Sequence, residues 1–489
     1  MTRSAAASAS AEREGRLYID GEFREAASGR RFEVISPTDE SVVATAADAG
    51  AEDVAAAVAA ARRAADETTW SSDHEFRQQC LRQLQEALRK EIADICVLQT
   101  LEAGTPQQVT PTMEAVVGDM SHYIEMVGSF PWETDFPAFR FLVLDSLRRV
   151  RYEPYGVVGA ITPWNGPFMP NMWKINGSLA TGNTIVLKTA PDSPLTGAAI
   201  AKAAAEHTDI PPGVLNVISS ADRATAGDAL TADQRVDMYH FTGSPSVGQR
   251  IMERAAVGIR KVVLELGGKS ANIVFADADL ERAAAAAPGG AFGNAGQDCC
   301  ARSRILVEES ALERFMALLE EHVTAIRVGD PLDPNTEMGP LISAGQRDSV
   351  ASFLADGDPV AFAGTAPEGP GYWFAPTVLG PVARSSRVAR EEVFGPIVAV
   401  LPFKDEEDAV ALANDTIYGL SGSIWTRDGG RALRVARAVD SGVLSINSNT
   451  SVRVATPFGG FKQSGYGREL GPHALDAYTE VKSIYYSTS

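Results

Sequence analysis

The sequence is poor in cysteine and histidine and carries less positive than negative charge. Among 489 residues there are 4 Cys and 6 His, and 44 Lys and Arg stand against 63 Asp and Glu. Four cysteines cannot form a disulfide framework for so long a chain, so we expect free thiols and a cytoplasmic protein. The net charge of -19 would repel a phosphate backbone, which argues against nucleic acid or an anionic membrane and favours a small-molecule partner.

Long hydrophobic runs are also missing. No stretch of about 18 apolar residues occurs, so we expect no transmembrane helix. The N-terminal segment MTRSAAASASAEREG has no hydrophobic core of the signal-peptide type, and it predicts a disordered tail over residues 1–15. We expect no metal site.

An alternation of short apolar runs and helical segments dominates the rest of the chain. Residues 51–67 and 75–101 predict two helices. Runs rich in β-branched residues then alternate with Ala-rich helical segments, first over 155–275 and again over 304–446. This rhythm is typical of parallel strands joined by crossover helices, and it predicts an α/β fold with two such domains.

One segment interrupts this alternation. Residues 139–154, FRFLVLDSLRRVRYEP, have an apolar start and a basic end. They suit an extended arm or an edge strand whose free edge is paired, and another subunit could supply the pairing.

The adjacent cysteines Cys299 and Cys300 lie in the stretch GNAGQDCC, residues 293–300. Its glycines let the backbone approach a ligand closely, which a buried structural thiol would not require. A catalytic cysteine must be partly thiolate and needs a donor that holds negative charge on the oxygen of the group attacked. A hydrolase would pair the thiol with His, yet no His lies nearby in the sequence, which is weak evidence because folding can bring one close.

Three other stretches place polar residues at the ends of predicted strands, where α/β sheets bind ligands. ITPWNGPF offers Asn165, either a turn residue or an amide donor for an oxyanion. FTGSPSVG is not a GxGxxG motif, but it places Gly243 and Ser244 before a helix, where a phosphate can bind. VLELGGKS ends a strand with Glu265, which faces either a site or a structural cation.

Together these stretches resemble the aldehyde dehydrogenase superfamily over nearly the whole chain. The resemblance rests on PWN (163–165), FTGS (241–244), LELGGKS (264–270), GQDC (296–299), EEVFGP (391–396) and PFGGFKQSGYGRELG (457–471). The combination is far more specific than any one motif. It implies an enzyme of the hydrolytic, non-acylating type, which oxidises an aldehyde to the carboxylic acid with NAD(P).

The resemblance also implies an architecture of two Rossmann-like, doubly wound α/β domains. Residues 1–130 and 154–267 would form the dinucleotide-binding domain, and residues 268–463 the catalytic domain. Residues 131–153 and 473–489 would form a small arm of bridging strands used for oligomerisation, in a homodimer or a homotetramer.

The same resemblance assigns the chemistry to three residues. Cys299 attacks the aldehyde carbon, and the Asn165 side chain and the backbone N–H of Cys299 hold the oxygen of the resulting thiohemiacetal. Hydride then leaves for the nicotinamide of the bound dinucleotide and a thioester remains. Glu265 is the general base that activates water to hydrolyse this thioester.

The cofactor contacts carry over in the same way, with NAD expected and NADP possible. They are Trp164, Lys188, Gly243, Ser244, Leu266, Glu392 and Phe394. Pro191 departs from the pattern, because many NAD-dependent relatives have Glu three residues after the lysine. Without that carboxylate, both a contact with the ribose and a repulsion of a 2′-phosphate are lost.

The substrate pocket is the part of the site that the motifs describe least. The resemblance places Trp173, Phe292 and Phe458 along an aldehyde tunnel, and Gly166 and Gly293 where bulkier side chains often occur, which implies an apolar tunnel. Arg453 is either a surface residue or a contact for a polar substrate tail.

Three rival functions remain open at this stage. A CoA-acylating aldehyde dehydrogenase would share the cysteine and the fold but typically lacks the general base, so Glu265 argues against it. A cofactor-independent cysteine hydrolase would need a His partner, and a non-catalytic NAD-binding protein would need no intact set of Cys, Glu and Asn.

Overall fold

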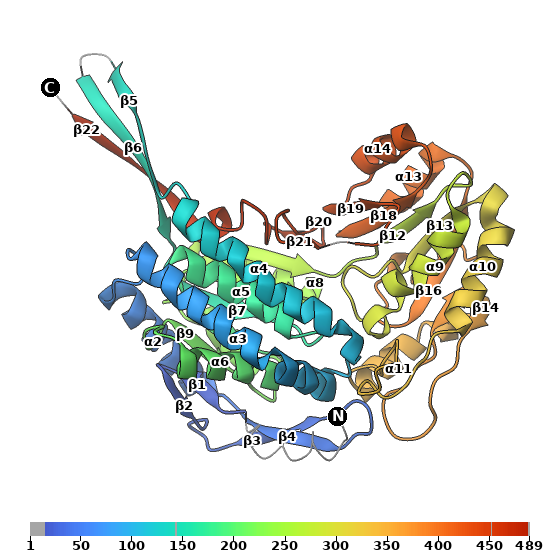
Figure 1. Ribbon diagram of the computed structural model, residues 1–489, viewed down its shortest axis with the longest axis horizontal. Helices are drawn as coiled ribbons and strands as arrows, with labels where there is room; N and C mark the ends of the chain where they lie inside the picture. The colour runs from blue at the N-terminus through green and yellow to red at the C-terminus, as the bar shows by residue number, and fades with distance from the viewer. Residues whose placement is uncertain (1–14, 142–143, 451, 488–489) are drawn as a thin grey trace.

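The computed structural model describes residues 15–141, 144–450 and 452–487, and it contains two mainly parallel sheets flanked by helices. A third, antiparallel sheet of three strands extends away from the body of the molecule (Figure 1). This mixed α/β arrangement confirms the predicted fold class.

The elements follow one another along the chain with these bounds. The strands are β1 (Leu17–Ile19), β2 (Glu22–Arg24), β3 (Arg31–Ile35), β4 (Val42–Ala47), β5 (Glu133–Phe141), β6 (Leu144–Pro154), β7 (Val157–Ile161), β8 (Thr184–Lys188), β9 (Leu215–Ile218), β10 (Met238–Gly243), β11 (Lys261–Leu266), β12 (Ala271–Val274), β13 (Arg304–Glu308), β14 (Val360–Ala363), β15 (Thr377–Leu379), β16 (Ile397–Phe403), β17 (Tyr418–Gly419), β18 (Ser421–Trp425), β19 (Val443–Ile446), β20 (Phe461–Lys462), β21 (Gly465–Tyr466) and β22 (Thr479–Ser487). The helices are α2 (Ala51–Glu67), α3 (His74–Ala103), α4 (Thr110–Ser129), α5 (Phe168–Thr181), α6 (Leu195–His207), α7 (Thr225–Ala232), α8 (Pro245–Gly258), α9 (Leu280–Ala291), α10 (Leu312–Thr324), α11 (Ala344–Ala351), α12 (Arg387–Arg390), α13 (Glu406–Asn414) and α14 (Gly429–Ala438). Short 3-10 helices are η2 (Gln107–Val109), η3 (Gly293–Gly296), η4 (Glu309–Ala311), η5 (Leu354–Asp356) and η6 (Asp476–Tyr478).

The first sheet has the strand order β2-β1-β9-β8-β7-β10-β11-β21, and its central strands from β9 to β11 are parallel. The chain passes from β7 through β8 to β9 in one direction and then returns to place β10 on the other side of β7. The order of the strands therefore reverses between β7 and β10. In open α/β sheets a ligand binds at such a switch point, outside the carboxyl ends of the strands.

Helices cover both faces of the first sheet, as expected of a doubly wound fold. On one face α3, α4, α5 and α6 pack around buried side chains such as Leu84, Met120 and Ile175. On the other face α2, α7 and α8 enclose a second core with Val58 and Leu230. Helix α2 has the predicted bounds, and α3 extends the predicted helix by one residue at its start and two at its end.

The second sheet has the order β14-β15-β16-β13-β12-β18-β19 and is parallel except for β14. Its first strand in the chain, β12, is the run ANIVF, which the sequence rhythm grouped with the strands before it. That grouping by rhythm is wrong, because the periodicity of a buried run does not report which sheet it joins, and it differs from the domain boundary between residues 267 and 268 that the resemblance implies. Residues 267–270 alone connect β11 in the first sheet with β12 in the second.

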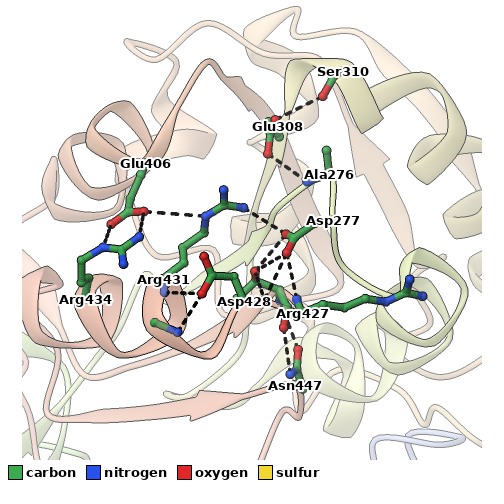
Figure 2. A network of polar contacts seen from close by, with 12 residues as sticks. Ala276, Asp277, Glu308, Ser310, Glu406, Arg427, Asp428, Arg431, Arg434 and Asn447 are labelled. Atoms are coloured by element: carbon green, nitrogen blue, oxygen red, sulfur yellow. Dashed lines mark hydrogen bonds and ion pairs between the residues drawn. The ribbon is translucent and has the colours of Figure 1, made fainter.

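Hydrogen bonds and ion pairs fasten α13 and α14 to the end of β12 (Figure 2). The Asp277 carboxylate accepts hydrogen bonds from the backbone N–H groups of Arg427 and Asp428, both at 3.1 Å. Arg431 lies between Asp277, at 3.0 Å, and Glu406, at 3.7 Å. This network fixes the N-terminus of α14 and has no part in the site described below.

The antiparallel sheet β22-β6-β5 corresponds to the predicted arm, residues 131–153 and 473–489. Residues 142–143 and 488–489 of that prediction lie outside the described residues. Strand β22 begins only after Tyr478, whose side chain is buried against the first sheet. The first residues of the predicted C-terminal arm are therefore part of the body of the molecule.

The last residue of the predicted tail, Gly15, is paired with another segment of the chain. Residues 1–14 lie outside the described part of the chain, but Gly15 exchanges backbone hydrogen bonds with Thr45 and Ala47, at 3.1 and 2.7 Å. Gly15 is thus paired with β4, contrary to its assignment to the tail. No helix within the described residues is long and apolar enough to span a membrane.

Candidate active site

A cavity of about 290 Å³ opens at the switch point of the first sheet. Trp164, Lys188, Gly243 and Ser244 line it, so the structure brings four of the predicted cofactor contacts together. They come from the loop after β7, from the last residue of β8, and from the junction of β10 with α8. Ser244 is the N-cap of α8, and the N-terminus of a helix of 14 residues favours a bound phosphate.

The remaining predicted cofactor contacts gather around the loop that joins the two sheets. Phe394 meets the Trp164 ring edge to face, with the ring centroids 5.2 Å apart. Glu392 accepts a hydrogen bond from the backbone N–H of Gly268 at 2.9 Å, and burial raises its pKa to about 7. Leu266 is buried just before this loop. The motifs PWN, LELGGKS and EEVFGP therefore meet at one place.

The cysteine loop begins with an unusual turn. Asn294, Ala295 and Gly296 have φ angles of 51, 55 and 69°, a left-handed conformation that favours glycine. A Cβ on Gly296 would lie 2.2 Å from the carbonyl oxygen of Gly395. Gly296 thus serves a sharp turn and a close approach to the EEVFGP loop, whereas the predicted approach of this backbone to a ligand stays a prediction.

Contacts on both sides hold the backbone around Cys299. The Asn165 amide nitrogen donates to the carbonyl oxygen of Gln297 at 2.9 Å, and a Cβ on Gly268 would lie 2.3 Å from the carbonyl oxygen of Cys299. Within the described residues, no acceptor is bonded to the backbone N–H of Cys299. Asn165 therefore contacts the loop that carries Cys299, at a position two residues before the thiol.

The two thiols differ in their access to solvent. Cys299 is partly exposed and Cys300 is buried, and their sulfur atoms and the Asp298 carboxylate lie within 4.8 Å of one another. The hydrogen bond with Cys300, then burial, then the charges of Asp298 and Glu265 raise the pKa of Cys299 well above its usual value. Cys299 is thus a protonated thiol at neutral pH, and it must lose a proton before it attacks.

Glu265 is a buried carboxyl group without a hydrogen-bond partner among the described residues. Burial and then the charge of Glu469 raise its pKa well above the usual range, although Lys174 and Arg468 oppose this shift. A Cβ on Gly459 would lie 2.7 Å from its Oε1 atom. A buried polar group left unpaired is costly, and such groups with shifted pKa values are typical of functional sites.

A buried ionic network lies beside Glu265, and the sequence analysis did not find it. Lys174 Nζ is 2.7 Å from Glu469 and 2.6 Å from the Thr242 hydroxyl, and His240 Nε2 is 2.8 Å from the same carboxylate. His240 Nδ1 also contacts the Tyr478 hydroxyl. Burial raises the pKa of Glu469, but Lys174 and His240 outweigh it and hold this pKa below its usual range.

The sequence held only partial signals for this network. His240 is fully buried, but nothing around it in the sequence indicates that it meets Glu469. Glu469 stands in the quoted motif GRELG, but nothing in the motif says which cation it meets. Lys174 lies in α5, and nothing in the neighbouring sequence indicates that it belongs to this network.

Only two of the three predicted substrate-pocket residues lie together. Trp173 and Phe458 have ring centroids 5.3 Å apart and share a hydrophobic cluster with Cys300. Phe292 is buried in a separate cluster that belongs to the second sheet. Arg453 is exposed, and its guanidinium donates to the carbonyl oxygen of Val452.

Comparison with known proteins gives matches over nearly the whole chain. The model of the Aldehyde dehydrogenase family matches residues 23–484. An aldehyde dehydrogenase from Aspergillus niger is 39% identical over 479 residues, covering 96% of this chain and 94% of the relative. The betaine aldehyde dehydrogenase of Bacillus subtilis (strain 168) is 38% identical over 484 residues, covering 96% and 97%.

A solved structure also matches nearly the whole chain. The NAD+ complex of an aldehyde dehydrogenase from Bacillus cereus superposes with a TM-score of 0.95 at 36% identity, covering 100% of this chain and 99% of that one. Sequence and fold thus match over both sheets and the arm. The chain therefore belongs to the aldehyde dehydrogenase family and is an enzyme that oxidises an aldehyde with NAD(P).

Proposed function

We propose that the enzyme converts its aldehyde to the carboxylic acid through a thioester on Cys299, with Asn165 and Glu265 as the other catalytic residues. The observation that carries this proposal is the meeting of three unlike groups. A partly exposed thiol, an amide held against the thiol's own loop and a buried unpaired carboxyl group come from separate segments of the chain.

The first half of the reaction forms a covalent bond. The Cys299 thiol loses its proton to solvent water, its sulfur adds to the aldehyde carbon, and the carbonyl oxygen gains the negative charge. An Asn165 amide carries two N–H groups, and only one is engaged by Gln297. The second N–H and the backbone N–H of Cys299 are the donors for this oxygen, and donors placed in advance stabilise a developing charge strongly.

The second half of the reaction releases the acid. When bound, the dinucleotide would supply the acceptor for the hydride on the thiohemiacetal carbon, and Cys299 would then hold the acyl group as a thioester. Glu265 takes a proton from water, the water oxygen adds to the thioester carbon, and the carbon–sulfur bond breaks. The raised pKa of Glu265 makes its ionised form a stronger base than an ordinary carboxylate.

The dinucleotide fits the switch-point cavity in the first sheet. Lys188 supplies a cation near the ribose of the adenosine half, and Gly243 and Ser244 a helix N-terminus for the pyrophosphate. A Cβ on Gly243 would lie 2.4 Å from the Phe241 ring. The pyrophosphate can therefore approach the backbone at this position only if the residue is glycine. Glu392, with Phe394 and Trp164, serves the nicotinamide half.

This arrangement assigns residues 1–130 and 154–267 to cofactor binding and residues 268–463 to the nucleophile. The substrate enters beside Trp173 and Phe458, which favours an aldehyde with an apolar or aromatic body. We leave Phe292 out of this pocket because it packs in the other core.

The arm supports a homodimer or a tetramer built of dimers. Phe136, Phe139 and Leu147 on β5 and β6 are 45, 50 and 48% exposed, and Tyr485 and Tyr486 on β22 are 71 and 68% exposed. Large apolar side chains gathered on an exposed sheet mark an interaction surface. Sedimentation at micromolar concentration tests this, because a lone 51.9 kDa species would contradict it. The free cysteines favour the cytoplasm.

A panel of aldehydes tests the proposed reaction. Formation of NADH or NADPH is followed with each aldehyde, with and without coenzyme A, and the acid product is identified. Acid formed without coenzyme A supports the proposal. A strict need for coenzyme A would show an acylating enzyme, and ester hydrolysis without any dinucleotide requirement would show a hydrolase.

A further inference from the structure

The loop that carries the nucleophile also carries an acid. Asp298 stands immediately before Cys299, and its carboxylate and the sulfur atoms of Cys299 and Cys300 lie within 4.8 Å of one another. The Asp298 side chain is exposed, whereas Gln297 on its other side is buried. The proposed reaction builds negative charge here, first on the sulfur and then on the aldehyde oxygen. A carboxylate opposes both charges, so Asp298 makes the attack on a neutral aldehyde harder.

Two hydrogen bonds hold the Asp298 carboxylate beside the sulfur atoms. Its Oδ1 atom accepts from the backbone N–H of Cys300 at 2.9 Å. The backbone N–H of Ala301 donates to the carbonyl oxygen of Asp298, also at 2.9 Å, and closes the turn around the two cysteines. The carboxylate is therefore fixed next to the reacting sulfur and does not rotate freely into solvent.

The cations of this region lie below the surface of the site. Arg302, Lys269 and Lys174 are each no more than 2% exposed. The Arg302 guanidinium donates to the Cys300 carbonyl oxygen at 2.6 Å and to the Ser423 hydroxyl at 3.0 Å. Among the described residues Asp298 has no ion-pair partner. The side of the loop that solvent reaches is therefore negative.

We infer that Asp298 sets the charge preference of the enzyme, which selects aldehydes that carry a cationic group close to the carbonyl carbon. The inference rests on the proposed attack by Cys299 and deepens it by naming a substrate class. An ammonium group near the aldehyde is attracted by this carboxylate, whereas a neutral body gains nothing and an anionic one is repelled.

The short distance between the carboxylate and the nucleophile makes the position of the charge important. Once the aldehyde carbon is bonded to the Cys299 sulfur, a group on the next carbon lies close to Asp298, because the carboxylate is within 4.8 Å of that sulfur. Coulomb attraction falls with distance, and water and salt screen an exposed carboxylate further. The advantage of a positive charge should therefore be largest for the shortest spacer.

A cationic substrate also offsets the effect of Asp298 on the nucleophile. The hydrogen bond with Cys300 and burial raise the pKa of Cys299 most, and the charges of Asp298 and Glu265 add to this shift. An ammonium group brought by the substrate acts in the opposite direction, because it stabilises both the thiolate and the oxyanion. A cationic aldehyde thus assists the attack on its own carbonyl carbon.

Two aldehydes of the same shape test this preference. Trimethylammonioacetaldehyde and 3,3-dimethylbutanal differ in a single atom, a cationic nitrogen in place of a neutral carbon. The value of kcat/KM is measured for both with the wild-type protein and with Asp298→Asn, whose amide oxygen is still able to accept the hydrogen bond from Cys300. Differences in hydration and reactivity between the aldehydes cancel when their kcat/KM ratio is compared between the two proteins.

We expect Asp298→Asn to lower the ratio of kcat/KM, cationic over neutral, by about fivefold to tenfold. The decrease should be smaller for 3-trimethylammoniopropanal and 4,4-dimethylpentanal, which have one more methylene group. The anionic aldehyde 4-oxobutanoate should gain relative to the neutral one. Added salt should lower the ratio in the wild-type protein and change it little in the variant.

A matched control removes an aspartate elsewhere. Asp94 is exposed on α3, and Asp94→Asn should leave the ratio unchanged. Loss of the Asp298 charge also lowers the pKa of Cys299, but this changes the rates with both aldehydes alike. An unchanged ratio in Asp298→Asn, or the same decrease in Asp94→Asn, would overturn the inference. So would a change confined to the KM for NAD and equal for both aldehydes, because the carboxylate would then act on the cofactor.

Oxidation of the neutral aldehyde separates this inference from the proposed function. If the wild-type protein and Asp298→Asn both form acid from 3,3-dimethylbutanal with the same charge preference, only the role of Asp298 is wrong. If the wild-type protein oxidises none of these aldehydes, or if Cys299→Ala is equally active, the proposed function itself is wrong.

Discussion

Replacing Glu265 with Gln should separate the two halves of the proposed reaction. The side chain is 3% exposed and unpaired, so the amide fits the same space without the ability to accept a proton from water. Bond formation at Cys299 and hydride transfer precede the step that needs this base. The first turnover should therefore proceed and the next should stall.

The expected loss of steady-state turnover follows from the role of Glu265 as a general base. General base catalysis contributes about 10²- to 10⁴-fold, which corresponds to about 2.7–5.5 kcal/mol of activation free energy. No group among the described residues forms a hydrogen bond with the Glu265 carboxyl group, so a water molecule can bond to it, and its raised pKa makes it a strong base when ionised. We therefore expect steady-state turnover to fall toward the upper end of this range.

Rapid mixing with aldehyde and excess cofactor provides the assay. Glu265→Gln should give a burst of NADH of about one equivalent per subunit followed by a slow phase, and Cys299→Ala, the control, should give no burst. The reasoning is refuted if Glu265→Gln binds cofactor normally but shows no burst. In that case Glu265 would act earlier, by taking the proton from the Cys299 thiol.

Three further predictions concern the surroundings of these two residues. The negative charge of Glu469 raises the pKa of Glu265, so Glu469→Gln should move the rise of kcat with pH to lower pH; a profile shifted to higher pH would contradict this reading. Cys300→Ala should retain turnover and speed alkylation of Cys299 near neutral pH, because the hydrogen bond that raises the Cys299 pKa is lost; slower alkylation would count against it. Gly459→Ala places a methyl group 2.7 Å from the Glu265 carboxylate at a φ of 152°, so kcat should fall while the NADH burst persists, and unchanged kcat would show that the carboxylate has room to move.

The fold class was predictable because parallel strands buried on both faces leave a strong local signal. Runs such as NTIVLK and KVVLEL are rich in apolar and β-branched residues, and each lies in a strand of the first sheet. Membership of a particular sheet leaves no such signal, which is why ANIVF was grouped wrongly. The pairing of a strand depends on segments that are distant in the sequence.

The same distinction, between local sequence signals and contacts with distant segments, applies to the candidate site. The glycines Gly268 and Gly296 indicated that the backbone passes close to other atoms. In the structure these atoms are the carbonyl oxygens of Cys299 and Gly395, respectively. Lys174 could not be identified, because it contacts Glu469 and Thr242 from other segments of the chain. A lysine in an ordinary helix looks like a surface residue until the sheet is assembled.

The position of β21 in the first sheet has a consequence for folding order. Strand β11 carries Glu265 and pairs with β21, residues 465–466, although the entire second sheet lies between them in the chain. During synthesis β11 is an open edge until about 200 further residues have emerged. Contacts of such sequence separation form slowly, so the pocket around the general base is completed among the last parts of the molecule, after the loop that carries the nucleophile has been made.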